Sequence, residues 1–191
     1  MDIHEKFLNN KNYRELLFLE NNRPPTAEEV AKRIHEGRGG DLTEIGDFLG
    51  EVHPETKKTD PFIQEVLKQY AKLSIKKNDK FVPAMRSFFS HFKMPGEAQK
   101  IDRIAEAFSK EFSEKNPKIF TKDEAFILAY ATIMLSTNAH NPAVKNKMTK
   151  EEFLKGNIVT MKENVAKLEE KEKEKEKEKE KAEKAEADLL Y

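Results

Sequence analysis

Apolar side chains recur at the spacing of an α-helix along nearly the whole chain, and this pattern limits the fold more than any other feature. A late example is the series Leu154, Ile158, Met161, Val165 and Leu168, with gaps of four, three, four and three residues. Residues at these spacings lie on one face of a helix. We find no convincing run of alternating β-branched residues bounded by turn residues, the pattern that would indicate strands. The sequence therefore predicts an all-α protein.

Capping residues indicate where the helices begin and end. A Thr or Asp followed three residues later by Glu lets side chains bind the backbone N–H groups of a helix start. This spacing occurs at Thr26 and Glu29, Asp41 and Glu44, Thr121 and Glu124, and Thr149 and Glu152. Asp60 before Pro61 favours another helix start, and Gly37 favours a helix end in the left-handed conformation.

These signals predict about eight helices before the C-terminal tail. The first covers about residues 4–20. In the helix after Asp60 and in the next one, the apolar stripes expected to be buried are Phe62, Ile63, Val66, Leu67, Tyr70 and Leu73, then Phe81, Val82, Met85, Phe88, Phe89 and Phe92. A following helix carries Ile101, Ile104, Phe108 and Phe112. The helix at residues 125–135 is apolar almost all round, which favours a central position, and a polar loop follows it.

Charge is concentrated in the tail. Eighteen of the 22 residues at 167–188 are charged, whereas the whole chain has 35 basic and 35 acidic residues and no net charge. A neutral chain has no net field that would attract nucleic acid or an acidic membrane. We expect one domain over residues 1–160. Over residues 161–191 we expect an amphipathic helix that continues into a Glu/Lys-rich tail, helical or disordered.

Several chemistries are excluded by residue types that are missing from the sequence. The chain has no Cys, so disulfides, thiolate nucleophiles and sulfur-ligated zinc are impossible. Its five His residues form no i,i+4 pair, and neither a P-loop nor a GxGxxG motif occurs. The longest apolar stretch has eleven residues, far fewer than the roughly 20 that span a bilayer, and no secretory signal begins the chain. We expect a soluble protein without a metal site or cofactor of its own.

A tight corner at Pro95, Gly96 and Glu97 separates two predicted helices. Pro95 fixes one backbone angle and Gly96 frees the next, so the chain turns sharply and projects Glu97. From the residues alone, an acid in the first turn of a helix only complements the helix dipole. That interaction is worth about 0.3 to 1 kcal/mol and requires no further role.

Three segments around and beyond this corner resemble a known family. PGEAQKIDR at residues 95–103 resembles the first signature of the Sec-seven domain, the catalytic module of cytohesin-type guanine-nucleotide exchange factors for Arf GTPases. IGDFLGE at residues 45–51 resembles an early family segment, and AYATIMLSTNAHNPAVKNKMT at residues 129–149 resembles the second signature. Order and spacing agree over roughly residues 5–157.

This resemblance implies a right-handed superhelix of about eight to ten helices with a hydrophobic groove. The implied activity is nucleotide exchange on an Arf-family small GTPase, without covalent chemistry. Glu97 corresponds to the family's glutamic finger, which acts on the GDP and Mg²⁺ bound to the GTPase. We expect a monomer in the cytoplasm that reaches membranes only transiently, through its partner or through missing sequence. For a bacterial effector the expected place is the host-cell cytosol.

The resemblance also implies which residues bind the GTPase. Groove positions that accept its apolar switch regions are Phe126, Tyr130, Ile133 and Met134. Gln99, Lys100 and Asp102 match polar positions of the first signature, with Lys100 and Asp102 at the groove rim, and Asn141 matches a position that contacts the switch backbone. From the residues alone, the apolar ones are core residues and the polar ones are capping or surface residues.

Two departures from the second signature leave alternatives open. Ser136 stands where the family usually has Asn, and Ala139 where it has Leu. Loss of a fully buried Leu would cost about 2 to 5 kcal/mol and could weaken exchange. The first alternative is therefore a module that binds Arf without exchange activity. The second is a helical scaffold whose charged tail serves as a spacer, so that removal of residues 167–191 would abolish capture of its partner.

Overall fold

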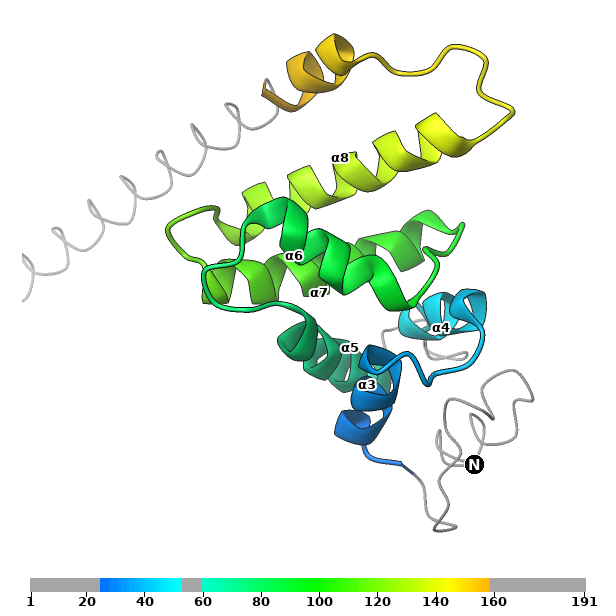
Figure 1. Ribbon diagram of the computed structural model, residues 1–191, viewed down its shortest axis with the longest axis vertical. Coiled ribbons are helices and arrows are strands. Elements are labelled where there is room, and N and C mark those ends of the chain that lie inside the picture. The colour runs from blue at the N-terminus through cyan, green and yellow to red at the C-terminus, as the bar shows by residue number, and fades with distance from the viewer. Residues whose placement is uncertain (1–24, 53–59, 159–191) are drawn as a thin grey trace, which may run out of the picture. The chain divides into compact units, whose positions relative to one another are not determined.

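The computed structural model describes residues 25–52 and 60–158, and its elements are helices (Figure 1). They are α3 (Ala27–His35), α4 (Leu42–Leu49), α5 (Pro61–Ser74), α6 (Phe81–Phe88), the 3-10 helix η2 (Phe89–His91), α7 (Ala98–Lys115) and α8 (Lys122–His140), followed by a helical segment within residues 150–158. The all-α prediction is confirmed. The predicted helix at residues 4–20 and the charged tail lie outside the described residues, and the superhelix and its groove stay predictions.

The chain divides into two compact units, residues 1–130 and 131–191. The first unit contains the helices from α3 to α7 and the start of α8, and the second contains the rest of α8 and the segment that follows. The predicted boundary at residue 160 lies outside the described residues and stays a prediction.

The predicted caps are present at the helix starts. Thr26 and Glu29 form a reciprocal capping box on α3, in which the Thr26 backbone donates to Glu29 Oε2 at 2.8 Å. Asp41 and Asp60 accept hydrogen bonds from the first backbone N–H groups of α4 and α5. The same reciprocal pattern joins Thr121 to Glu124 and Thr149 to Glu152. Gly37 has φ +70°, the left-handed conformation predicted for the end of α3.

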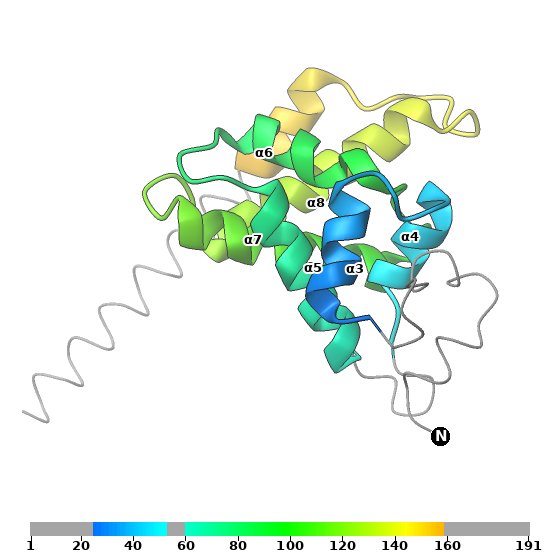
Figure 2. The ribbon, with the colours of Figure 1, turned by 60° about the horizontal axis from the view of Figure 1, so that its bottom comes forward.

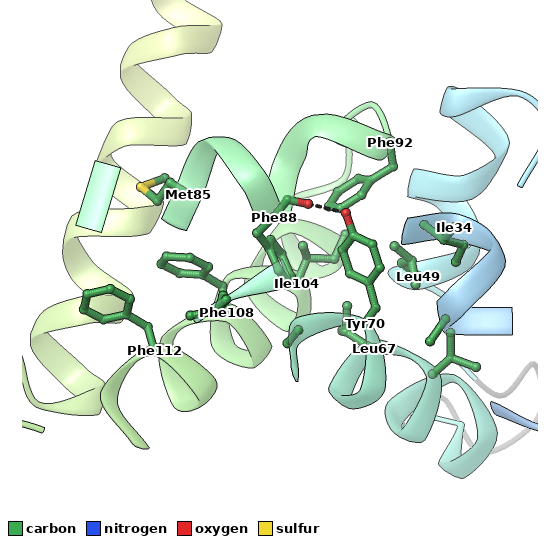
Figure 3. Packing of buried hydrophobic residues seen from close by; sticks show 14 of the residues in the cluster. Ile34, Leu49, Leu67, Tyr70, Met85, Phe88, Phe92, Ile104, Phe108 and Phe112 are labelled. Carbon is green, nitrogen blue, oxygen red and sulfur yellow. Dashed lines mark hydrogen bonds between the residues drawn. The ribbon is translucent and has the colours of Figure 1, made fainter. Parts of the chain in front are cut away.

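Aromatic rings fill the core of the first unit (Figure 3). The Tyr70 hydroxyl on α5 donates to the Phe88 carbonyl oxygen at 2.6 Å, which satisfies a polar atom inside the core. The rings of Phe88 and Phe108 lie 5.4 Å apart, so α6 and α7 pack through aromatic contacts. Helices α3 and α5 lie side by side (Figure 2). This core fixes α7, whose first turn follows the predicted corner.

Two predicted core residues are exposed. Leu73 on α5 has 40% of its surface exposed and Val82 on α6 has 55%. At 100° per residue, Val82 points about 100° away from Phe81 and off the buried face. Leu73 lies at the edge of a face that is closed by Ala71 and Ser74, both buried. The small residues Ala71 and Ser74 are therefore buried where the apolar pattern alone predicted that Leu73 would be buried.

Helix α8 extends five residues beyond its predicted end at Leu135. Side chains in the extension bond to backbone carbonyls four residues earlier: Thr137 Oγ1 donates to the Ile133 oxygen at 3.0 Å, and His140 Nδ1 lies 2.8 Å from the Ser136 oxygen. Helix α8 ends at His140, two residues before Pro142, because a proline disfavours the helical conformation of the residue before it. Most side chains at residues 125–135 are only partly buried, so the expected central position is not supported.

We expect the free energy of unfolding to decrease when the pH drops below about 6.5, because the folded protein favours the neutral form of the His91 imidazole. Burial, followed by the neighbouring His35, whose ring centroid lies 5.6 Å away, lowers the pKa of His91 below 6.5. The unfolded chain therefore takes up a proton first, and stability decreases from about pH 6.5 down to the lowered pKa. Urea denaturation of wild type and His91→Gln between about pH 7.5 and 5.5 checks this. The variant should lose less stability over that window, and equal losses would contradict the prediction.

Candidate functional site

The corner before α7 is packed against α4. The Lys93 backbone N–H donates to the Leu42 carbonyl oxygen at 2.8 Å. A Cβ atom on Gly46 would lie 1.8 Å from the Lys93 carbonyl oxygen and 3.6 Å from Cδ of Pro95, which is buried. No side chain fits into this contact, so only glycine lets α4 approach the corner so closely. The backbone that leads to Glu97 is thereby held on a helix.

Gly96 has a different role from the one expected. Its φ lies outside the left-handed region, so the turn does not require glycine for its backbone conformation. A Cβ added at Gly96 would meet nothing within 4 Å. The position is exposed, and glycine there leaves the surface beside Glu97 free of side-chain atoms.

Glu97 is the N-cap residue of α7, with φ −85° and ψ 124°, and its side chain makes no capping hydrogen bond. The carboxylates of Asp41 and Asp60 do make such bonds at the starts of α4 and α5. The Glu97 side chain is 73% exposed. Its carboxylate is therefore not used to complete the helix start and projects from a fixed backbone position.

Lys100 lies close to three carboxylates. Its Nζ is 3.2 Å from Asp47 Oδ1, 3.2 Å from Glu51 Oε2 and 3.7 Å from Glu97 Oε1. The Lys100 side chain is only 9% exposed, and its place at a groove rim stays a prediction. Burial by itself lowers the pKa of Lys100, but the hydrogen bonds and charges of Glu51 and Asp47 outweigh burial and raise it. The ammonium is therefore held in its charged form.

A second glycine brings α4 and α7 together at Lys100. A Cβ on Gly50 would lie 2.5 Å from the Lys100 Cβ. One turn along α7, Arg103 Nε donates to the Gly50 carbonyl oxygen at 2.8 Å. Sequence reasoning noted the segment at residues 45–51 only as a resemblance and gave none of its residues a role. The sequence signal was the pair Gly46 and Gly50, four residues apart, which allows close helix contact. Each glycine is followed directly by an acid that contacts Lys100.

The other predicted site residues are exposed or lie on α8. Gln99 and Asp102 are exposed on the first turns of α7. On α8, the rings of Phe126 and Tyr130 are stacked with centroids 6.1 Å apart, and both are half-buried. They adjoin the buried face formed by Ala125 and Ala129. These two rings and the corner with Glu97 belong to the first unit, on different helices.

The remaining predicted residues belong to the second unit. Ile133 is buried and Met134 is half-buried on α8. Asn141 is exposed, and its Oδ1 accepts a hydrogen bond from the Ala143 backbone at 3.0 Å. Asn138 Oδ1 accepts from the Met148 backbone at 2.8 Å. The two asparagines thus organise the loop after α8.

The two departures from the family pattern fall on exposed positions. Ser136 and Ala139 are both exposed. The packing cost expected for replacing a buried Leu at position 139 therefore does not apply, because the side chain there is not buried.

Neither a metal site nor a membrane span is found in the described ranges. No group of three or more His, Asp or Glu residues in residues 25–52 and 60–158 could hold a metal ion. In the same ranges, no helix combines the length and the apolar character needed to cross a bilayer.

Comparisons with known proteins give matches at the level of a domain. The chain is 43% identical over 131 residues to brefeldin A-inhibited guanine nucleotide-exchange protein 2 of Arabidopsis thaliana, a match that covers 68% of this chain. The human brefeldin A-inhibited guanine nucleotide-exchange protein 1 is 42% identical over 135 residues, or 69% of this chain. Each match covers 7% of the length of the relative.

Solved structures with a similar fold include isolated domains and a complex. The crystal structure of the Sec7p catalytic domain matches with a TM-score of 0.58 and 35% identity over 69% of this chain and 67% of that one. A structure of ARF1-GDP bound to a Sec7 domain complexed with brefeldin A matches with a TM-score of 0.57 and 32% identity, over 67% of this chain and 62% of that one. The N-terminal Sec7 domain of RalF matches with a TM-score of 0.51 and 38% identity, over 66% of this chain and 61% of that one.

The family pattern of the Sec7 domain covers residues 2–172, nearly the whole chain. This match includes the corner at residues 95–97, helix α4 beneath it and all of α8. The resemblance seen in the sequence is confirmed at family level, while the cytohesin-type subgroup stays a prediction. The chain belongs to the Sec7 domain family.

Proposed function

We propose that this chain accelerates GDP release from an Arf-family small GTPase and that Glu97 is the residue that acts on the nucleotide site. The observation that carries this proposal is the uncapped, 73% exposed carboxylate at a backbone corner packed on α4. Membership of the Sec7 domain family and the similarity to a Sec7 domain solved with ARF1-GDP support the choice of partner.

A carboxylate can loosen GDP by electrostatics alone. Placed in the nucleotide site of the GTPase, Glu97 would repel the β-phosphate, compete with it for the Mg²⁺ region and pair with the phosphate-binding lysine. Juxtaposed like charges at a desolvated interface cost several kcal/mol, and each 1.4 kcal/mol is tenfold in an equilibrium. One well-placed side chain can therefore dominate the rate.

The corner places the Glu97 carboxylate precisely. The contact of Gly46 with Lys93 fixes the backbone two to four residues before Glu97, and the missing side chain at Gly96 clears the surface beside it. A fixed acid next to an unobstructed backbone can enter a narrow site reproducibly, whereas an acid on a loose loop would lose part of its effect.

We propose that the stacked rings of Phe126 and Tyr130 bind the apolar switch regions of the GTPase. Both rings are half-buried, so they offer apolar surface without leaving the fold. We further propose, from the resemblance, that Gln99 and Asp102 on α7, and Ile133, Met134 and Asn141 in the second unit, each contact the GTPase. Action in the cytoplasm, with transient presence at membranes through the bound GTPase, belongs to this proposal.

Tyr130→Ala should weaken the GTPase complex about tenfold, equivalent to about 1.4 kcal/mol, because it removes one of two stacked aromatic rings from the docking surface. The apparent KM for the GTPase should rise by that factor while the maximal rate changes little. Titration of the exchange rate against GTPase concentration measures both. A lower maximal rate at unchanged KM would contradict a docking role.

The direct test of the function is a fluorescent-nucleotide release assay with soluble Arf and Arf-like proteins. The whole chain should accelerate GDP release from at least one of them. Binding to the GDP-bound or nucleotide-free GTPase without faster release would favour the exchange-deficient module. No binding at all, together with loss of another partner after removal of residues 167–191, would favour the scaffold.

A further inference from the structure

We infer that Lys100 is a positioning residue for Glu97: held by Asp47 of α4 and by Glu51 just beyond the end of α4, it orients the Glu97 carboxylate without neutralising it. This inference rests on the proposed exchange function and adds a mechanism for controlling the acting group. It uses two acidic residues, one in α4 and one just after it, to which the sequence assigned no role.

The three distances around Lys100 are unequal, and the inequality is informative. The ammonium lies 3.2 Å from one oxygen each of Asp47 and Glu51, within hydrogen-bond range, but 3.7 Å from Glu97. Its donors are therefore directed mainly to the carboxylates of Asp47 and Glu51. Glu97 faces the same positive charge at longer range, which attracts its carboxylate while leaving that carboxylate without a hydrogen bond from Lys100.

The exposed fractions of the three carboxylate side chains increase in the same order as their distances from the Lys100 ammonium. The Lys100 side chain is 9% exposed, Glu51 31%, Asp47 45% and Glu97 73%. The positive charge is thus fixed below the surface, where side-chain motion is restricted, and the acting carboxylate is outermost. Gly50 makes this placement possible, because any side chain there would collide with the first carbons of Lys100.

The arrangement also sets the charge of the corner. Three carboxylates surround a single ammonium, so the cluster of Asp47, Glu51, Glu97 and Lys100 carries a net formal charge of minus two. Because Glu97 is held only weakly by Lys100, its carboxylate can leave Lys100 and pair with a cationic group of the GTPase at a small cost in free energy. Without Lys100, the carboxylates of Asp47 and Glu51 would repel Glu97 and let it sample positions away from the nucleotide site.

Lys115 provides a matched control at the other end of α7. Its Nζ donates to the carbonyl oxygens of Ile75 at 2.6 Å and Lys72 at 2.8 Å and pairs with Glu111 at 3.0 Å. Lys115→Met therefore removes a comparable set of polar contacts from α7, about 27 Å from Glu97 at 1.5 Å per residue. A purely structural effect of losing such a lysine should be similar in both variants.

The experiment compares Lys100→Met and Lys115→Met in the whole chain, with GDP release measured over a range of GTPase concentrations. We expect Lys100→Met to lower the maximal rate about tenfold with KM within twofold of wild type, and Lys115→Met to change the maximal rate less than twofold. In a Glu97→Asp background, where the shortened acid no longer reaches its position near Lys100, Lys100→Met should lower the rate less than threefold.

Glu51→Gln tests the same idea if Lys100→Met fails to fold. The amide keeps the shape of Glu51 and still accepts the Val52 backbone hydrogen bond, but it releases Lys100 toward Glu97. The maximal rate should fall about threefold at unchanged KM. Glu106→Gln, which alters an exposed α7 acid paired with Lys122 at 2.7 Å, should leave the rate unchanged.

Three results would overturn the inference. Equal losses for Lys100→Met and Lys115→Met would make Lys100 a structural residue only. A raised KM at unchanged maximal rate would make it a contact of the partner, and an undiminished loss in the Glu97→Asp background would uncouple it from Glu97. Failure of the wild-type chain to accelerate release is a separate result, which would overturn the proposed function as well.

Discussion

Replacing Glu97 with Lys should reduce the stimulated release of GDP at least a hundredfold, which corresponds to about 2.7 kcal/mol. The change turns a charge that repels the β-phosphate into one that attracts it, so the variant should hold the nucleotide in place. The folded domain should be unaffected, because the Glu97 side chain is 73% exposed and makes no capping bond. Stopped-flow or fluorimetric release of a fluorescent GDP from a soluble Arf protein measures the effect.

Glu114→Lys is the matched control for this charge reversal. Glu114 is an exposed acid in the last turn of the same helix, so the variant has the same net charge and a similar change on α7. We expect its exchange rate to stay within about twofold of wild type, because screening at physiological salt acts over about 8 Å. Similar losses in the two variants would show that overall charge, and not the position of Glu97, controls the rate.

Gly46→Ala should destabilise the chain by about 2 to 4 kcal/mol and should also lower the exchange rate. The new Cβ would lie 1.8 Å from the Lys93 carbonyl oxygen, a backbone atom that no rotamer change can move away. Overpacking typically costs 1 to 3 kcal/mol, and the displaced Lys93 N–H bond to Leu42 adds about 1 kcal/mol. Urea denaturation measures the stability, and the release assay measures the displacement of the corner.

Gly96→Ala separates this effect from a general intolerance of side chains in the corner. A Cβ there meets nothing within 4 Å, and φ is not left-handed, so stability should change by less than about 0.5 kcal/mol. If Gly96→Ala destabilised as much as Gly46→Ala, the corner would be sensitive to any added atom, and the packing of α4 would not be the cause.

The helices and their starts were predictable because capping and periodicity are local properties. Thr26, Asp60 and Thr121 cap the helices that their spacing to Glu or Pro indicated. The end of α8 was not predictable in this way, because the polar residues Thr137 and His140 lie within the helix, where their side chains bond to carbonyl oxygens of the preceding turn. The polar composition of that stretch indicated a loop, and nothing in the spacing of apolar residues could reveal the bonds.

The candidate site was predictable only as far as the family signatures extend. The signature assigned a role to Glu97, but its surroundings depend on contacts across about 50 residues of sequence, such as those of Lys100 with Asp47 and Glu51. Burial of Lys100 follows from the approach of α4 to α7, which is a tertiary property. A lysine between a Gln and an Ile gave no local sign that it would be enclosed by acids.

Helix α7 is fastened at both ends, and this has a mechanical consequence. Near its start, Arg103 and Lys100 bind α4, and at its last residue Lys115 binds the end of α5. At 1.5 Å per residue the 18 residues between these ends form a strut of about 27 Å. In the proposed complex, any force that the GTPase exerts on Glu97 would be transmitted along this strut to the aromatic core, so α7 would resist displacement at both of its ends.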